Sequence, residues 1–153
     1  MTVARKKVLF VTGALSGGGA ERFVSTALVH LDRDRFEPHL ALFRDEVTYE
    51  LPDDVPLEIL GATGGLRKLS TISKLVKWIN ANAPDVVVGS HWHPSMIIAE
   101  ALRWTRRRPR HISWVVNNPD WDATRFGFSK FWTQKNYPSI DRFVAVSNGV
   151  SEA

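Results

Sequence analysis

The chain has 153 residues, 44% of them hydrophobic, and its 20 basic side chains outnumber 16 acidic ones for a net charge of +4. This length and composition suit one domain with its own core and exclude a disordered or fibrous chain. The sequence contains no cysteine, which excludes a disulfide framework, a cysteine nucleophile and thiolate metal sites. No apolar run approaches the roughly 20 residues that a membrane-spanning helix needs.

The charge is divided unevenly along the chain. The first 60 residues carry seven basic and ten acidic side chains, whereas the remainder carries thirteen basic and six acidic ones. A basic half of this kind indicates an oriented anionic partner, such as a membrane, a phosphate group or a nucleic acid.

Short apolar runs typical of buried parallel strands alternate with helical patterns. We predict strands at residues 8–12, 39–43, 57–60, 86–88, 111–116 and 142–146. We predict helices at residues 21–31 and 66–80, a third from Pro94 to Leu102 with the proline as its first residue, and a short helix before the last strand. This alternation predicts a single Rossmann-like α/β domain over residues 1–153, an open parallel sheet with right-handed crossovers and helices on both faces.

The N-terminus begins with three basic residues at 5–7 and a short apolar run, which together resemble a signal peptide. Because the apolar run is short and glycines follow it, we interpret it as the first strand. We therefore expect a cytoplasmic protein.

A glycine-rich turn joins the first predicted strand to the first predicted helix, and it contains Gly17, Gly18 and Gly19. Glycines allow a ligand to approach the main chain closely, and the helix N-terminus beyond them offers N–H groups and a positive dipole end to an anion. The turn is not a P-loop, because no Lys-Ser or Lys-Thr pair follows. A tight turn that binds nothing is the alternative, but three glycines at the first crossover of a parallel sheet favour anion binding.

The same turn fits the threonine- and glycine-rich pattern of short-chain dehydrogenases, and Asn117-Asn118-Pro119 is similar to the asparagine-rich turn of that family. Such an enzyme needs a lysine four residues after its tyrosine to lower the tyrosine pKa. The chain has only Tyr49 and Tyr137, and an aspartate stands four residues after each. An NAD(P)-binding oxidoreductase therefore remains an alternative that lacks its acid–base residues.

Three strings occur in order along the chain: GGGAERFV at residues 17–24, DVVVGSH at 85–91 and DRFVAVSNGVSE at 141–152. Together they resemble the N-terminal domain of family 4 glycosyltransferases, which are retaining enzymes of the GT-B fold that use nucleotide sugars. In such enzymes the N-terminal domain holds mainly the acceptor and a C-terminal domain holds most of the donor, across a cleft between them.

The resemblance implies several properties of this chain. Gly17, Gly18 and Gly19 would lie against the donor diphosphate, and no metal or other cofactor would be required. The acceptor would be a glycan or a lipid-linked molecule. The donor-binding domain would lie outside these residues or in a partner chain, so that the chain alone would have no significant transferase activity.

Ligands of open α/β sheets gather at the carboxyl ends of the strands, so the residues that follow the predicted strands are further candidates. The candidates for contact with donor diphosphate or acceptor are Gly17, Gly18, Gly19, His91, Trp92, Asn117, Asn118 and Asp120, and further residues at these ends are His93, Trp121, Ser147 and Asn148. His91 and Asn117 are the candidate catalytic residues, although many family members carry a histidine where Asn117 stands. An asparagine still offers both a donor and an acceptor.

Several of these residues also have a purely structural interpretation. His91 and His93 are spaced as on one face of a strand, but no third ligand is evident, so we predict no zinc site. Partial burial or a surface position is expected for His30, His39 and His111. We expect Trp114 in the core, and Trp92 and Trp121 either in the core or at the edge of the cleft.

The helix predicted at residues 66–80 has an apolar arc made of Leu66, Leu69, Ile72, Val76 and Ile79. Arg67, Lys74 and Lys77 fall on the opposite side of the wheel, with Trp78 among them. A tryptophan on a basic face is typical of contact with an anionic bilayer. A second basic cluster consists of Arg103, Arg106, Arg107, Arg108 and Arg110.

We therefore expect peripheral binding to the cytoplasmic face of the inner membrane. Nucleic acid is not expected as the partner, because no recognised binding motif accompanies the charge. Three classes of function remain open at this point: half of a glycosyltransferase, an NAD(P)-dependent oxidoreductase and a non-catalytic binding module.

Overall fold

The computed structural model describes residues 4–61, 64, 66–115 and 130–145, and within them one parallel sheet has the strand order β3-β2-β1-β4-β5-β6. The strands are β1 (Lys6–Thr12), β2 (Phe36–Leu42), β3 (Leu57–Ile59), β4 (Val86–Ser90), β5 (Arg110–Val115) and β6 (Arg142–Ala145). The helices are α1 (Gly19–His30), α2 (Arg67–Asn82), α3 (Trp92–Leu102) and α5 (Lys130–Asn136), followed by the short 3-10 helix η1 (Tyr137–Ser139). This order confirms the predicted Rossmann-like α/β sheet.

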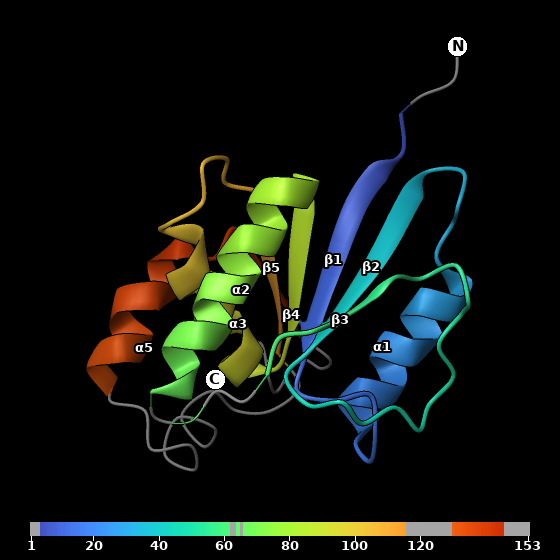
Figure 1. Cartoon of the computed structure of the whole chain (residues 1–153), viewed down its shortest axis with the longest axis horizontal. Coiled ribbons are helices and arrows are strands. Elements are labelled where there is room, and N and C mark those ends of the chain that lie inside the picture. Colours follow the sequence, from blue (N-terminus) through green and yellow to red (C-terminus); the bar gives the residue numbers. More distant parts are fainter. Residues whose placement is uncertain (1–3, 62–63, 65, 116–129, 146–153) are drawn as a thin grey trace.

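The sheet is covered on both faces because successive side chains of a strand point to opposite sides. In β1, Val8 and Phe10 belong to the core under α1, whereas Leu9 and Val11 belong to the core under α2 and α3. Figure 1 shows α1 apart from the other helices, and α2, α3 and α5 together on the other side of the sheet. The central strands β1 and β4 are apolar over most of their length because they are buried on both faces, whereas the edge strands β3 and β6 are largely exposed.

The third helix begins earlier than the sequence predicts. Pro94 was expected at its first position, but α3 starts at Trp92. Proline is tolerated at this place because the N–H groups of the first helical turn have no intrahelical acceptor. The predicted start was wrong by two residues, and the helix itself was correct.

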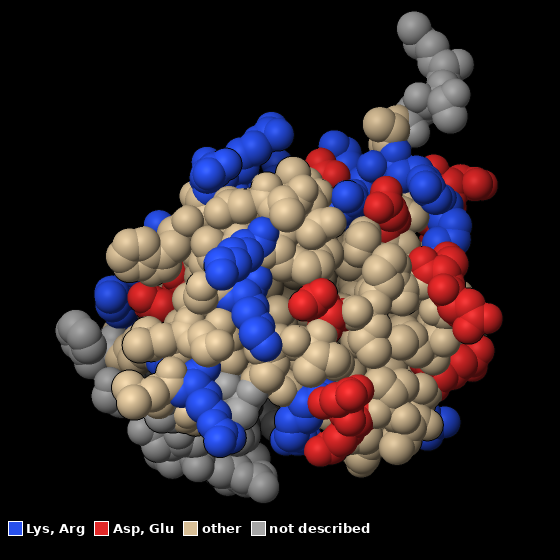
Figure 2. All heavy atoms as spheres, in the orientation of Figure 1, with Lys and Arg blue, Asp and Glu red and all other residues tan. Residues whose placement is uncertain are grey.

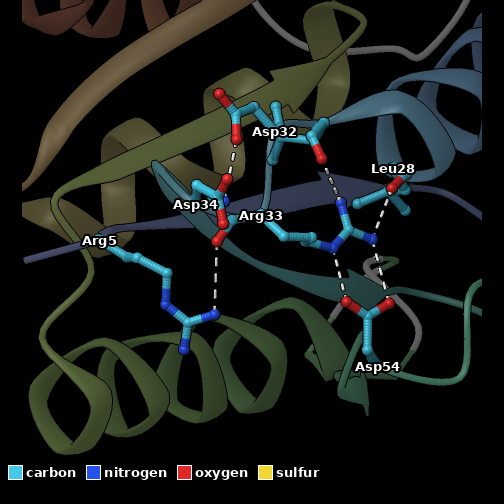
Figure 3. Close-up of polar contacts among 7 residues, drawn as sticks. Arg5, Leu28, Asp32, Arg33, Asp34 and Asp54 are labelled. Atoms are coloured by element: carbon cyan, nitrogen blue, oxygen red, sulfur yellow. Dashed lines mark hydrogen bonds and ion pairs between the residues drawn. The ribbon is translucent and has the colours of Figure 1, made fainter.

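The long loop between β2 and β3 is attached to the end of α1 by Arg33. The Arg33 guanidinium donates to Asp54 Oδ2 and Oδ1 at 2.5 and 3.1 Å, and also to the carbonyl oxygens of Leu28 and Leu31 at 2.8 and 2.9 Å (Figure 3). These carbonyl groups lie at the C-terminal end of α1, where intrahelical donors are lacking. One side chain therefore caps the helix and fixes the loop beside it.

Candidate functional site

The carboxyl ends of β1 and β4 lie next to each other in the middle of the sheet. β1 pairs with β2 on one side and with β4 on the other, so the turn after β1 and the residues after β4 leave the sheet from neighbouring strands. The chain turns to opposite faces at this topological switch point, which is where open α/β sheets bind their ligands. Two of the segments that the sequence predicts as a site, the glycine turn and the residues after β4, meet here.

The glycine turn is exposed at Gly17 and Gly19 and leads directly into helix α1. Gly17 has a φ of +79°, Gly18 is the extended N-cap of α1, and Gly19 is its first helical residue. A β-carbon on Gly17 or on Gly19 would meet no atom within 4 Å, and both residues are exposed. Among the described residues no side-chain hydrogen bond caps this helix, and the first N–H groups of an uncapped helix can bind an anion. Positive φ explains the glycine at position 17.

The first half of the same turn is rigidly supported. Ala14 and Leu15 are fully buried. The Leu15 N–H donates to the Glu46 carbonyl at 2.9 Å, and the Leu15 carbonyl accepts the Thr48 N–H at 3.0 Å. The open glycines therefore follow a segment that is anchored by main-chain hydrogen bonds and by the burial of its side chains. This anchoring holds the turn in place before any ligand binds.

His91 follows β4 in a strained backbone conformation. Its φ and ψ are 78° and 164°, a combination that residues with a β-carbon rarely adopt. The main chain is held there because the His91 N–H donates to the Trp114 carbonyl at 2.9 Å and its carbonyl accepts from Ser95 Oγ at 2.8 Å. Strain that the surrounding structure enforces is concentrated at binding and catalytic sites.

Glu21, in the first turn of α1, connects His91 to the glycine turn. Its Oε1 lies 3.4 Å from His91 Nε2, and its Oε2 lies where a β-carbon of Gly18 would be. A carboxylate on one imidazole nitrogen fixes the ring and leaves the other nitrogen to bond a ligand oxygen. Glu21 was not among the predicted site residues. Its sequence signal was an acidic residue three positions after the N-cap of a helix that begins with glycines.

Helix α3 can begin close to the sheet because Gly89 has no side chain. A β-carbon there would approach Ser95 Oγ to 2.5 Å, Ile98 Cδ1 to 2.9 Å and Ser95 Cα to 3.0 Å. Ser95 Oγ also lies 2.7 Å from Ser113 Oγ on β5. This close packing places the start of α3, and with it His91, directly at the end of β4.

The structure assigns Trp92 to the core. It is 2% exposed, packs with Met96 and Ile140, and its ring centroid is 6.1 Å from that of Trp132. The expectation that it stands in a loop at the cleft edge is wrong, because α3 already begins at this residue and turns the indole inward. The alternative prediction, that Trp92 lies in the core, is confirmed. The same prediction for Trp114, which is 5% exposed, is also confirmed.

His91 and His93 do not share a face. They lie at the start of a helix instead of on a strand, so that His91 contacts Glu21 while the His93 ring lies 5.7 Å from that of Phe43. Burial, together with the charge of Lys68, lowers the pKa of His93 to about 4. In the described part of the chain no group of three or more His, Cys, Asp or Glu residues is arranged to hold a metal ion.

The other three histidines differ in their exposure to solvent. His39 and His111 are buried and His30 is exposed. The candidates that lie outside the described residues are Asn117, Asn118, Asp120, Trp121, Ser147 and Asn148.

Helix α2 buries a different stripe than the helical wheel indicates. Leu66 and Leu69 are 87% and 67% exposed, so their predicted place in the apolar arc is wrong. The buried stripe consists of Thr71, Ile72, Leu75 and Ile79. Trp78 flanks this stripe, where its large ring is partly buried, packs on the core and lies 5.2 Å from the His39 ring. The expectation that Trp78 stands on the basic face is therefore also wrong.

The predicted basic residues themselves are exposed. Arg67, Lys74 and Lys77 lie on the outer side of α2, and Arg106 and Arg107 follow α3. Figure 2 shows basic side chains in a row over α2, with acidic side chains gathered on the opposite side of the same view. In this view most acidic side chains lie toward the edge away from α2, where basic side chains are also present.

The chain matches the sequence family Glycosyltransferase Family 4 over residues 17–153. It belongs to glycosyltransferase family 4. Among curated proteins no sequence match was found. The family match favours the glycosyltransferase interpretation over the dehydrogenase one.

Solved structures agree with this family at the level of the fold. The family 4 chain is similar to the apo lipopolysaccharide outer core galactosyltransferase WaaB, with a TM-score of 0.74 and 18% identity over 95% of this chain and 41% of WaaB. It is also similar to Anabaena HepE in complex with UDP and glucose, with a TM-score of 0.66 and 19% identity over 97% of this chain and 40% of HepE. The chain therefore spans about two fifths of these proteins and has the fold of the N-terminal half of GT-B. Among its described helices, none is long and apolar enough to cross a membrane.

Proposed function

We propose that this chain is the acceptor-side domain of an enzyme that transfers a sugar, with retention, from a nucleotide sugar to a glycan or lipid-linked acceptor. The observation that carries the proposal is the family match over residues 17–153, combined with an exposed, uncapped glycine turn at the switch point of the sheet. HepE, which is similar in fold, was solved with UDP and glucose and with UDP-glucose. A uridine nucleotide sugar is therefore the first donor to test.

Each group at the switch point has a role in this proposal. The main chain of Gly17, Gly18 and Gly19 contacts the donor diphosphate from the acceptor side of the cleft. His91, oriented by Glu21, bonds a sugar hydroxyl or a phosphate oxygen. These contacts need no metal ion, because N–H dipoles and an imidazole supply the positive potential.

Asn117, Asn118 and Asp120 belong to the same proposal, because they follow β5, the neighbour of β4, in the sequence. Asn117 and His91 are the proposed catalytic residues of this domain, with Asn117 offering both a donor and an acceptor to the substrate.

The enzyme needs a second domain in this proposal. WaaB and HepE are about two and a half times as long as the part that the chain covers, since it spans 41% and 40% of them. A C-terminal domain or a partner chain would supply the donor-binding half. The chain alone would then bind ligands weakly and show no significant transfer.

Ligand titration tests the proposal. We expect calorimetric binding of UDP, UDP-glucose or UDP-galactose and no tight binding of NAD(P). Gly19→Ala adds a methyl group in open space at the helix N-terminus and should weaken nucleotide binding by about tenfold, roughly 1.4 kcal/mol. Gly13→Ala, also with open space around its β-carbon, is the matched control and should bind like the wild type. Tight NAD(P) binding without a response to sugar nucleotides contradicts the proposal.

The same proposal includes peripheral membrane binding through Arg67, Lys74, Lys77, Arg106 and Arg107, which favours a cytoplasmic protein at the inner membrane face. Exposed cations near an anionic bilayer each contribute about 1 kcal/mol. Co-sedimentation with phosphatidylglycerol vesicles should decrease in a Lys74→Glu, Lys77→Glu double variant. Equal sedimentation with phosphatidylcholine vesicles removes this part of the proposal.

A further inference from the structure

A second concave site lies away from the glycine turn, among the three helices on the other face of the sheet. It is a cavity of about 420 Å³ between α2, α3 with the turn after it, and α5, and it is lined by Lys68, Leu69, Ile72, Glu100, Trp104, Trp132 and Lys135. In Figure 1 these helices lie together on the side of the sheet opposite to α1. Its volume is within the range of small-molecule sites.

Two tryptophans give the cavity its aromatic surface. Trp104 is 70% exposed, so it contributes little to the core of the domain. Trp132 is partly buried, and Lys68 Nζ lies 3.3 Å from the centroid of its ring. An exposed indole beside a hollow offers a flat apolar surface to the C–H face of a ligand ring.

The polar lining complements the indoles. The Glu100 side chain is 20% exposed, and its buried Oε2 has no hydrogen-bond partner among the described residues. Its ion pair with Arg103 Nε is long, at 3.9 Å. The side chain is still 20% exposed and lines the hollow, so its accessible part offers a hydrogen-bond acceptor to a ligand that brings hydroxyl donors. Lys135, on the opposite wall, offers an ammonium donor to ligand oxygens.

We infer that the cavity between α2, α3 and α5 binds a neutral hexose unit of the acceptor glycan, with Trp104 against the ring and Glu100 accepting from its hydroxyls. The choice of a glycan rests on the proposed function. A pyranose has an apolar C–H face surrounded by hydroxyls, which matches an indole beside a carboxylate and an ammonium group. The two lysines of the lining, Lys68 and Lys135, also suit an anionic lipid headgroup, so the test includes vesicles. The site would hold the acceptor chain outside the catalytic cleft.

Titration with two neutral hexasaccharides, maltohexaose and β-1,4-galactohexaose, tests this inference on the 153-residue chain. We expect at least one to bind with a Kd at or below about 1 mM. Trp104→Ala should weaken that binding at least tenfold and Glu100→Gln at least fivefold. Trp104 is largely exposed, so its variant is expected to fold. The matched controls Leu57→Ala and Glu58→Gln, on exposed residues of β3, should bind like the wild type.

Three results overturn the inference. The first is no binding of either hexasaccharide up to about 10 mM, and the second is hexasaccharide binding that both Trp104→Ala and Glu100→Gln retain. The third is vesicle binding that Trp104→Ala abolishes while neither sugar binds. The last result would assign the cavity to lipid. Titration of the same variants with UDP-sugars separates this inference from the proposed function. Trp104→Ala should leave nucleotide binding unchanged, whatever happens to the glycan.

Discussion

His111 is a buried, uncharged imidazole, and it makes the stability of the domain depend on pH. It is fully buried in β5, and neither ring nitrogen has a hydrogen-bond partner among the described residues. Burial lowers its pKa from 6.5 to about 4, since a cation there would lose its hydration. The charge of Asp141 opposes this effect and that of Arg108 adds to it.

The direction of the pH effect follows from these values. In the unfolded chain the imidazole takes up a proton as the pH falls below about 6.5, whereas in the folded chain it stays neutral down to about 4. The unfolded state therefore binds more protons, and the free energy of unfolding decreases with falling pH across this window. The loss is about 2 kcal/mol at pH 5 and about 3 kcal/mol at pH 4, close to its full value.

Urea unfolding of the wild type and of His111→Leu at pH 7.5 and pH 5.0, followed by circular dichroism, measures this contribution. Leucine leaves no unsatisfied polar atom, so the variant should be at least as stable as the wild type at pH 7.5. Between the two pH values it should lose about 2 kcal/mol less than the wild type. The control His30→Gln changes an exposed histidine and should follow the wild type. An equal loss in wild type and His111→Leu would refute the reasoning.

The measurement stops at pH 5 because carboxylates titrate below it. The pKa of Asp141 is lowered, chiefly because its carboxylate accepts a hydrogen bond from the main-chain N–H of His111. The stability that this carboxylate contributes is present above its ordinary pKa and is lost as the pH falls through the lowered one. The histidine and carboxylate effects therefore occupy different pH windows.

Three further predictions concern the packing and the strain described above. Gly89→Ala should lower the free energy of unfolding by about 1–3 kcal/mol in urea titrations, because its methyl group overlaps the start of α3, whereas Gly13→Ala should change it little. His91→Gly should be more stable than His91→Ala by about 1 kcal/mol, since only glycine relieves the strained φ; equal midpoints would show that the strain is negligible. Asp54→Asn should lower the urea midpoint slightly at pH 7. As the pH falls below 3.8, the variant should lose less stability than the wild type, because hydrogen bonds from Arg33 lower the pKa of the wild-type carboxylate.

The fold was predictable because the central strands β1 and β4 contain apolar runs and most of the connections between strands have a regular helical pattern. The glycine turn was predictable as a site for a related reason. A cluster of glycines between a buried strand and a helix is seldom needed for the fold alone. A parallel sheet also brings the carboxyl ends of its strands together at one edge. The pairing of His91 with Glu21 was not predictable, because the two residues are 70 positions apart and meet only when β1 and β4 become neighbours.

The misassigned residues lie where a helix meets its neighbours. A helical wheel gives the angular order of side chains but not the angle at which the helix rests on the sheet. That angle placed Trp78 against the core and left Leu69 exposed. Trp92 was misplaced for a similar reason, since α3 began two residues early and turned its indole inward.

The sequence by itself determined the class of fold, the glycine turn and the family, because each depends on local patterns or on short strings of residues. Only the tertiary structure decided which side chains meet: Glu21 with His91 at the switch point, and Glu100 and Trp104 with Trp132 and Lys135 of α5 around a cavity between helices. Such contacts arise from the packing of elements distant in sequence, and their geometry is set by all the neighbours together.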